Sequence, residues 1–310
     1  MHRISFYHCS TNDNLFCKPM DRLMNNETIN RLVEAGVQRL RPLPAVAARL
    51  LALVNSPYSS ADDVAALMEK DPALTGTVLK MANSAFYGMP RSVSNVNAAI
   101  VVLGFNAVRS IALTSAIAGA VPVGSLDAKK FWKHSVTVAA AAKFIAGKLD
   151  IVNAPDSETA FCAGILHDIG RIVLDISFPG SLKEIRRITK EKFVPTHRAE
   201  FELFGVNHNR VGSRIAERWG LPPELECAMV YHHEPLACEG EQIIALITAF
   251  ADVFAHRVKC GTYDDEPVPL IPLSCAAPLG LDTEKIESLF NEFEKTAANS
   301  SAYIDAMGIS

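Results

Sequence analysis

Apolar residues that recur at helical spacing are the feature that most constrains the fold of this 310-residue chain. In the segment 127–149, one stripe runs through Phe131, Ser135, Val138, Ala142, Ile145 and Leu149, at alternating intervals of four and three residues. This period matches an α-helix with one buried face. No segment alternates apolar and polar residues in the way that several half-buried strands would require. The sequence therefore predicts an all-α fold.

Helix-starting and helix-breaking residues divide the chain further. Asp71 followed by Pro72 is typical of an N-cap with proline in the first turn, and it predicts a helix to about Ala85. Gly104 separates two apolar helical segments. The predicted helices span 43–54, 62–69, 71–85, 95–103, 105–119, 127–149, 157–166, a segment after His167, 182–190, 207–219, 223–232, 242–257 and 283–296.

The sequence VPVGS at residues 121–125 is the best candidate for a linker between two helical subdomains. Residues 1–125 hold 11 basic and 8 acidic residues, a net charge of +3, and the remainder holds 19 basic and 26 acidic residues, a net charge of −7. We predict a tail over 1–24, an N-terminal helical subdomain over 25–125, a second helical subdomain over 126–258 and a C-terminal helical extension over 259–310. The overall charge of −4 makes direct nucleic-acid binding unfavourable.

The chain begins without an apolar run of signal-peptide length. Its longest uncharged stretches, 92–108 and 110–126, are interrupted by Ser, Asn, Gly, Thr or Pro, which indicates buried helices and no membrane contact. Seven cysteines form no CxxC pair, so we expect scattered reduced thiols without a disulfide framework. Together these features predict a cytoplasmic protein.

Histidines and aspartates interrupt apolar helix faces in the second subdomain. They are His134, His167, Asp168, His208, His232, His233 and Asp252. A lone inward histidine is usually a hydrogen-bonded core residue. Burying so many without partners would be costly, whereas a metal centre satisfies them together. Imidazole and carboxylate ligands suit Fe, Mn, Zn or Ni, and Asp168, directly after His167, could bridge two ions that activate a water and clamp a phosphate. The prediction is one or two divalent transition-metal ions.

These residues resemble the H…HD…D signature of the HD superfamily of metal-dependent phosphohydrolases, with His134, His167-Asp168 in GILHDIGR and Asp252 in AFADVF. His208 and the YHHEP pair resemble the additional histidines of two-metal members such as the HD-GYP phosphodiesterases. The first half, with DPALTGTVLKMANSAFYG followed by VVLGFNAVRSIAL, is similar to the N-terminal part of the HDOD domain, the HD-related output domain. The resemblance covers about residues 31–257.

The HDOD resemblance implies a two-part all-helical fold, with an N-terminal helical subdomain packed on an HD-like bundle. It also implies a role in bacterial signal transduction, as a regulatory output module that contacts a signalling protein partner and carries a metal-binding site. The alternative is a metal-dependent phosphohydrolase or phosphodiesterase acting on a nucleotide or cyclic nucleotide, with Asp168 and Arg171 as catalytic residues. A redox or metal sensor is a third reading. The oligomeric state stays open.

Three positions depart from the HD-GYP pattern. EPLACEG follows the histidine pair in place of the DGxGYP stretch, so recognition of cyclic di-GMP in that manner is not expected. Arg171 replaces the lysine that follows the HD pair, and it either pairs with Asp168 on the helix surface or faces a phosphate. Lys130 stands four residues before His134, where a two-metal site can have a glutamate ligand.

Overall fold

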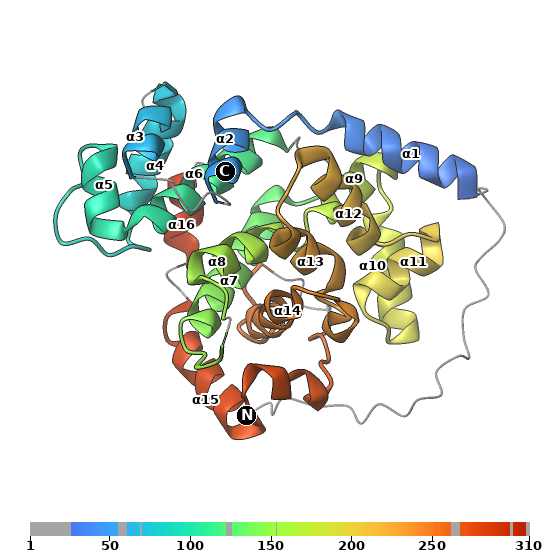
Figure 1. Ribbon diagram of the computed structural model, residues 1–310. Helices are drawn as coiled ribbons and strands as arrows, with labels where there is room; N and C mark the ends of the chain where they lie inside the picture. The colour runs from blue at the N-terminus through green and yellow to red at the C-terminus, as the bar shows by residue number, and fades with distance from the viewer. Residues whose placement is uncertain are drawn as a thin grey trace.

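The computed structural model describes residues 26–54, 61–68, 70–121, 126–152, 154–261, 267–297 and 300–307. All regular secondary structure in these ranges is helical, which confirms the predicted all-α class (Figure 1). The α-helices are α1 Asn26–Arg39, α2 Ala45–Val54, α3 Ala61–Met68, α4 Pro72–Ala82, α5 Val96–Leu103, α6 Phe105–Ala120, α7 Ala128–Ala146, α8 Ser157–Leu166, α9 Gly170–Ser177, α10 Leu182–Lys192, α11 Thr196–Phe204, α12 His208–Trp219, α13 Pro223–Tyr231, α14 Gln242–Arg257, α15 Thr283–Glu294 and α16 Ser300–Met307. Short 3-10 helices occupy Pro235–Ala237 (η1), Leu273–Cys275 (η2) and Ala277–Leu279 (η3).

Helices α2 to α6 form the N-terminal part of the fold, with α6 at its centre (Figure 1). Helix α6 contacts α2, α4 and α5 and also α8 of the second part. Because it is packed on several sides, most of its residues are buried. Even Arg109 in its middle is buried, with 8% exposure. The helix α4 begins as predicted, because the Asp71 side chain accepts a hydrogen bond from Leu74 N at 3.0 Å.

The second part is organised around the close pair α7 and α8, with α14 packed on both. Gly164 on α8 makes the close approach possible, because a Cβ atom at this position would lie 2.5 Å from Ala139 Cα on α7. Helices α9, α12 and α13 complete the bundle, and α13 contacts α8, α12 and α14. Helices α7, α8, α12, α13 and α14 therefore lie together in one bundle (Figure 1).

The first and the last helix of the described chain each pack against helices that lie far away in the sequence. Helix α1 packs on α9 and α12, and α16 returns from the C-terminal extension to pack on α4 and α7. Tyr303 of α16 is fully buried, and its ring meets Phe86 edge-on with a centroid separation of 5.0 Å. The subdomain boundaries stay a prediction; the tail and most of the VPVGS linker lie outside the described residues.

Several helix ends differ from the prediction for local reasons. Helix α4 stops at Ala82 because the Asn83 side chain bonds the backbone of Val93 twice, donating to its carbonyl oxygen at 2.9 Å and accepting from its N–H at 2.7 Å. Helix α7 ends at Ala146, three residues before the last member of its predicted stripe. The helices α1, α11 and α16 were not predicted at all.

Cysteine pairing is also different from the expectation of reduced thiols. Cys227 on α13 and Cys238 after η1 form a disulfide, with Cα atoms 6.4 Å apart. The pair was missed because the two residues are separated by 11 positions and come together only when η1 folds the chain back. Among the described residues, Cys162, Cys260 and Cys275 are free.

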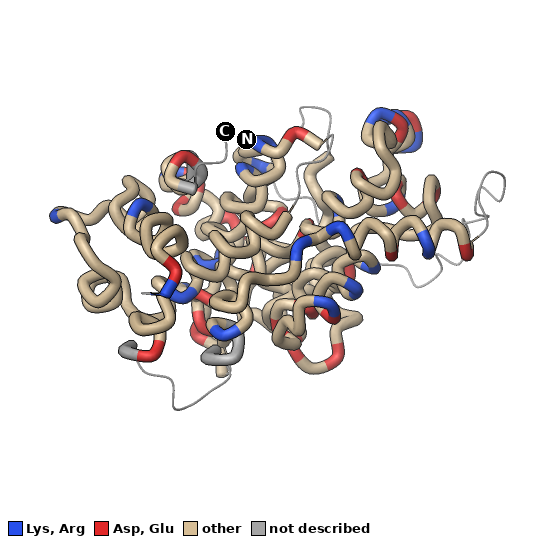
Figure 2. The backbone as a smooth tube through the Cα atoms, turned by 90° about the horizontal axis from the view of Figure 1, so that it is seen from above, with Lys and Arg blue, Asp and Glu red and all other residues tan. Residues whose placement is uncertain are grey.

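The lengths and the apolar character of the helices bear on the membrane question. No helix in the described ranges combines the length and the apolar character needed to cross a bilayer. Basic and acidic positions are interspersed along the backbone (Figure 2). The cytoplasmic location stays a prediction.

Replacing Gly164 with Ala should destabilise the protein by about 1–3 kcal/mol, because the added methyl group overlaps the α7 backbone. Urea unfolding measures the change. Gly76→Ala is the matched control: Gly76 lies inside α4 with open space around it, so this variant should gain about 0.5–1 kcal/mol from helix propensity. Equal effects of the two substitutions would contradict the packing described here.

Candidate metal centre

The structure brings all seven predicted ligand residues to one place. His134 comes from α7, His167 from the C-terminal end of α8 and Asp168 from the turn before α9. His208 begins α12, His232 and His233 follow α13, and Asp252 lies within α14. All are buried except His233, which is partly buried. The side chains form two groups that share Asp168: His134 and His167 on one side, and His208, His232 and His233 on the other.

Asp168 stands between the two groups with one carboxylate oxygen toward each. Its Oδ2 atom lies 3.6 Å from His167 Nε2 and 3.9 Å from His134 Nε2. Its Oδ1 atom lies 3.1 Å from His208 Nε2 and 3.8 Å from His232 Nε2. Asp252 completes the first group, with Oδ1 3.2 Å from His134 Nε2 and 4.0 Å from His167 Nε2. This is the arrangement expected of a carboxylate that bridges two ions.

Close packing around the His167-Asp168 turn sets this geometry. Gly170 follows two residues later, and a Cβ atom there would lie 2.1 Å from the carbonyl oxygen of His208. Only glycine lets the start of α9 press so closely on the start of α12. Asn207 caps α12 by accepting a hydrogen bond from Arg210 N at 3.2 Å, which fixes His208 as its first residue. The turn and the helix start therefore hold Asp168 and His208 together.

Hydrogen bonds behind the rings aim three histidines at the centre. The Nδ1 atom of His167 is 2.8 Å from Gly164 O, and that of His232 is 2.9 Å from Ala228 O. For His208, Glu200 Oε2 is the partner at 2.6 Å, and the same oxygen accepts from His208 N at 2.9 Å. A proton on Nδ1 leaves the Nε2 lone pair available as a ligand. The second group accordingly turns its Nε2 atoms toward one another, His208 to His232 at 3.4 Å and His208 to His233 at 3.2 Å.

Buried polar atoms without a hydrogen-bond partner test whether a metal fits these residues. Within the described part of the chain, they include His134 Nε2 and His167 Nε2, both of which face the first group. Leaving such atoms unpaired would cost on the order of 1–3 kcal/mol each. A divalent transition metal would satisfy all of them with the nitrogen and oxygen donors that these ions accept. The residues present therefore fit one ion in each group.

The protonation states in the cluster suit metal ligands, with charged carboxylates and neutral imidazole rings. Burial raises the pKa of a carboxyl group, but His167, His208 and Arg171 outweigh burial and hold the pKa of Asp168 well below its usual value. His256 and His134 do the same for Asp252. Burial lowers the pKa of His167 and brings that of His232 to about 3, so both rings are neutral near pH 7.

His208 differs from the other ligand histidines. Burial works against its charged form, but the carboxylates of Glu200 and Asp168 outweigh burial and raise its pKa above the usual value. A raised pKa means that the proton stays on the ring to a higher pH and must leave before Nε2 can bind a metal. Glu200 thus both orients His208 and sets how readily it becomes a ligand.

Arg171 pairs with Asp168, which is one of the two roles that its sequence position left open, and the phosphate-facing role stays a prediction. Its Nη1 atom donates a hydrogen bond to Asp168 Oδ2 at 3.0 Å. The same side chain lines a pocket that reaches the cluster, together with Asp168, Thr196, His208, His233, Asp252, His256 and Pro267. A fixed guanidinium beside the bridging carboxylate is suited to an oxyanion such as a phosphate group.

Three residues at the site were missed from the sequence. Glu200 lies on α11, which was not predicted, and it is 2% exposed. His256 is one helical turn after Asp252, and its Nδ1 is 2.9 Å from Asp252 Oδ1, a spacing that the i+4 pattern could have revealed. His197 stacks on His233 with ring centroids 4.0 Å apart, and nothing in the sequence pointed to this contact.

An all-helical bundle that buries a His/Asp cluster around an HD dipeptide defines a protein of the HD type. More specifically, the chain belongs to the HDOD family, because the HDOD domain profile matches residues 40–235. This confirms the resemblance seen in the sequence.

Solved structures agree with the assignment. An HDOD domain protein of unknown function from Geobacter sulfurreducens is 26% identical, with a TM-score of 0.73, over 91% of this chain and 99% of that one. A Shewanella amazonensis SB2B protein, provisionally named a phosphohydrolase, is 25% identical, with a TM-score of 0.70, over 89% and 98% of the two chains. An uncharacterised Treponema pallidum protein is 26% identical over 296 residues, and the chain spans 57% of its length.

Replacing Glu200 with Gln should weaken metal binding by about 10- to 100-fold, because His208 loses the charged partner that orients it. Competition with a chelator measures the affinity. Glu202→Gln is the matched control on the same helix, since Glu202 pairs with Lys192 and does not contact a ligand residue. Equal affinities for the two variants would show that Glu200 does not support the site.

Proposed function

We propose that this HDOD protein is a signalling protein whose metal centre hydrolyses a phosphoester of a nucleotide or cyclic nucleotide. The observation that carries the proposal is the position of Asp168, with one oxygen toward each of two ligand groups. A centre used only for structure needs one closed set of ligands, whereas a pair of groups joined by a carboxylate suits phosphate chemistry. The provisional name of the Shewanella protein points the same way.

Different residues would bind the metal ions, bind the phosphate and orient the ligands in such a reaction. His134, His167, Asp168 and Asp252 would hold one ion, and Asp168, His208, His232 and His233 the other. When bound, the two ions supply Lewis acidity that lowers the pKa of a water and neutralises phosphate charge. Arg171 is anchored by Asp168 and would bind a phosphate oxygen at the pocket beside the cluster. Glu200 and the backbone carbonyls behind the rings keep the ligands oriented.

Asp168→Ala should remove most of the bound metal and abolish phosphoester turnover, because it takes one ligand from each group. Elemental analysis and a panel of nucleotide phosphoesters measure the two effects. Asp150→Ala, at an exposed position between α7 and α8, should retain both metal and turnover. Undiminished turnover in Asp168→Ala would refute the proposal.

A regulatory interaction role is the second candidate, and an exposed apolar surface on α5 favours it. Val101 is 84% exposed and Val102 49% exposed, in the N-terminal part of the fold and away from the ligand residues. Contiguous exposed apolar surface of this kind can mark a protein-interaction site. The partner would be another signalling protein.

The two candidates predict opposite results in a host strain that lacks the gene. If partner contact is the output, Asp168→Ala should restore the transcript profile of the wild type, and Val101→Asp should fail because a charge enters the apolar surface. If hydrolysis is the output, only Val101→Asp should restore it. Immunoblots confirm equal protein levels. Restoration by both variants would contradict both candidates.

A further inference from the structure

The Cys227–Cys238 disulfide encloses two ligands of the second group. Cys227 lies on α13 and Cys238 directly follows η1, so the closed ring of chain runs through both His232 and His233. Both cysteines are 5% exposed. The other cysteines in the described ranges are free. The disulfide therefore lies at the metal centre, where it can act on the position of ligand residues.

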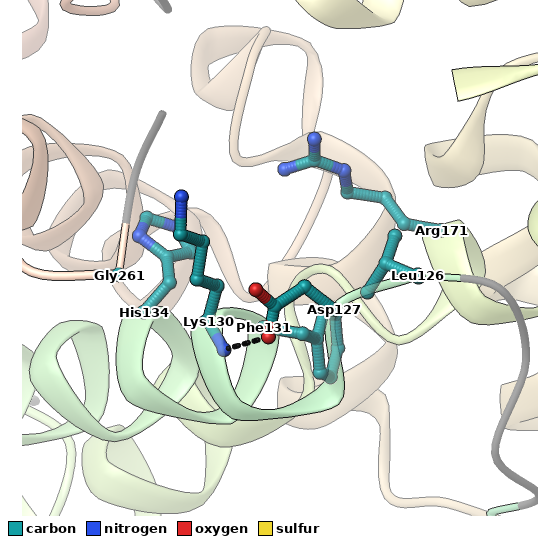
Figure 3. Close-up of a pocket in the computed structure, with 7 residues that line it drawn as sticks. All are labelled: Leu126, Asp127, Lys130, Phe131, His134, Arg171 and Gly261. Atoms are coloured by element: carbon teal, nitrogen blue, oxygen red, sulfur yellow. Dashed lines mark hydrogen bonds between the residues drawn. The ribbon is translucent and has the colours of Figure 1, made fainter. Parts of the chain in front are cut away.

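The first group does not depend on a crosslink, because packed helices hold its ligands. His134 and Asp252 lie inside α7 and α14, and these helices pack on each other. Gly261, after α14, presses on the α7 backbone beside His134, where a Cβ atom would lie 2.2 Å from His134 N (Figure 3). His167 ends α8 and is held by the Gly164 carbonyl oxygen at 2.8 Å.

His233 of the second group lies in the turn that the disulfide closes. The neighbouring His232 is still held by α13, since its Nδ1 atom is 2.9 Å from Ala228 O. His233 is one residue further along, and its ring rests on other rings: it stacks on His197 with centroids 4.0 Å apart, and its Nε2 atom is 3.2 Å from His208 Nε2. Its position therefore depends on the path of the turn.

Other contacts of this turn are few and local. Glu234 N donates to Tyr231 O at 2.8 Å, and Gln242 of α14 donates a side-chain hydrogen bond to Leu236 O at 3.2 Å. Opening the disulfide would leave these hydrogen bonds and the packing of the buried Pro235 to hold the turn. We therefore expect His233 to be the ligand that moves most.

The fold as a whole has no need of this crosslink. A continuous apolar core runs through both parts of the described chain, whereas disulfides as structural staples are typical of small domains that lack such a core. In a cytoplasmic protein, the location that the sequence predicts, a disulfide is usually transient and often senses the redox state. The position of the bond and this compartment both favour a reversible function.

We propose that the Cys227–Cys238 disulfide is a redox switch that determines whether the second group retains its metal ion. The inference rests on the proposed function, because it requires an ion in that group. The oxidised form holds both ions, and the reduced form loses the ion at His233. Phosphoester hydrolysis that needs both ions would then run only in the oxidised form, which gives this signalling protein an input.

A dithiol reductant supplies the chemistry of the switch. Cys238 is flanked by the exposed residues Ala237 and Glu239, so its sulfur is the one that the reductant reaches when the turn opens. A thiolate of the reductant bonds to this sulfur, the S–S bond breaks, and Cys227 leaves and takes a proton. The second thiol of the reductant then displaces Cys238. Two electrons and two protons pass to the protein, and the reductant becomes a disulfide.

Metal content in the two redox states tests the switch. The samples are oxidised protein, protein reduced with dithiothreitol that is then removed without oxygen, and the double variant Cys227→Ser/Cys238→Ser. Cys260→Ser is the matched control, because Cys260 is a free, partly buried thiol outside the crosslink. Each sample is dialysed against a chelator before elemental analysis, and thiol titration after denaturation gives its redox state. Hydrogen exchange over residues 232–238 follows the turn in metal-free protein.

Oxidised protein and Cys260→Ser should retain both ions. Reduced protein and the double variant should bind the second ion roughly 10- to 100-fold more weakly and exchange faster over 232–238, with no change over α8. Oxidised dithiothreitol should restore the reduced wild type. Equal metal content in the two redox states, or a bond that does not open and re-form in the folded protein, would overturn the inference and leave the proposed function intact. Protein without metal in either state would refute the proposed function, and hydrogen exchange would still show whether the bond controls the turn.

Discussion

The shared carboxylate of Asp168 is the constraint on which the rest of the site depends. Its two oxygens face histidines from different helices, so α7 and α8 on one side and α12 and α13 on the other must be held in fixed relative positions. Glycine makes this possible at two contacts: Gly164 lets α8 approach α7, and Gly170 lets the HD turn approach the start of α12. The packing of the bundle thus holds the Asp168 carboxylate between two groups of histidines.

Electrostatics explain why such a cluster is retained in a protein interior. Burial lowers the pKa of His167 and His232 and keeps these rings neutral, and the carboxyl groups of Asp168 and Asp252 stay charged because cationic and imidazole groups surround them. Unpaired donor and acceptor atoms in the centre make the cluster costly as part of an apolar core, whereas a bound cation turns the same atoms into ligands. Perturbed pKa values of this kind are common at functional sites.

Sequence patterns predicted the helices whose stripes or caps are local, such as α8, α12 and α14, and the seven candidate ligand residues that the structure brings together, but not His256. They could not predict contacts set by tertiary packing. The contact of Glu200 with His208 depends on the position of α11, which the sequence did not predict. The Cys227–Cys238 pairing depends on η1, which folds the chain back. The open pairing of Arg171 was also decided by packing, since one side chain reaches both Asp168 and the pocket.

The central claim is that Asp168 joins two metal ions, and anomalous X-ray diffraction from crystals of the protein as purified tests it most directly. Data collected on either side of the absorption edge of the metal found by fluorescence should show two anomalous peaks. One should lie among His134, His167, Asp168 and Asp252, and the other among Asp168, His208, His232 and His233. A cluster without anomalous density, or with one peak that Asp168 does not contact, would contradict the account.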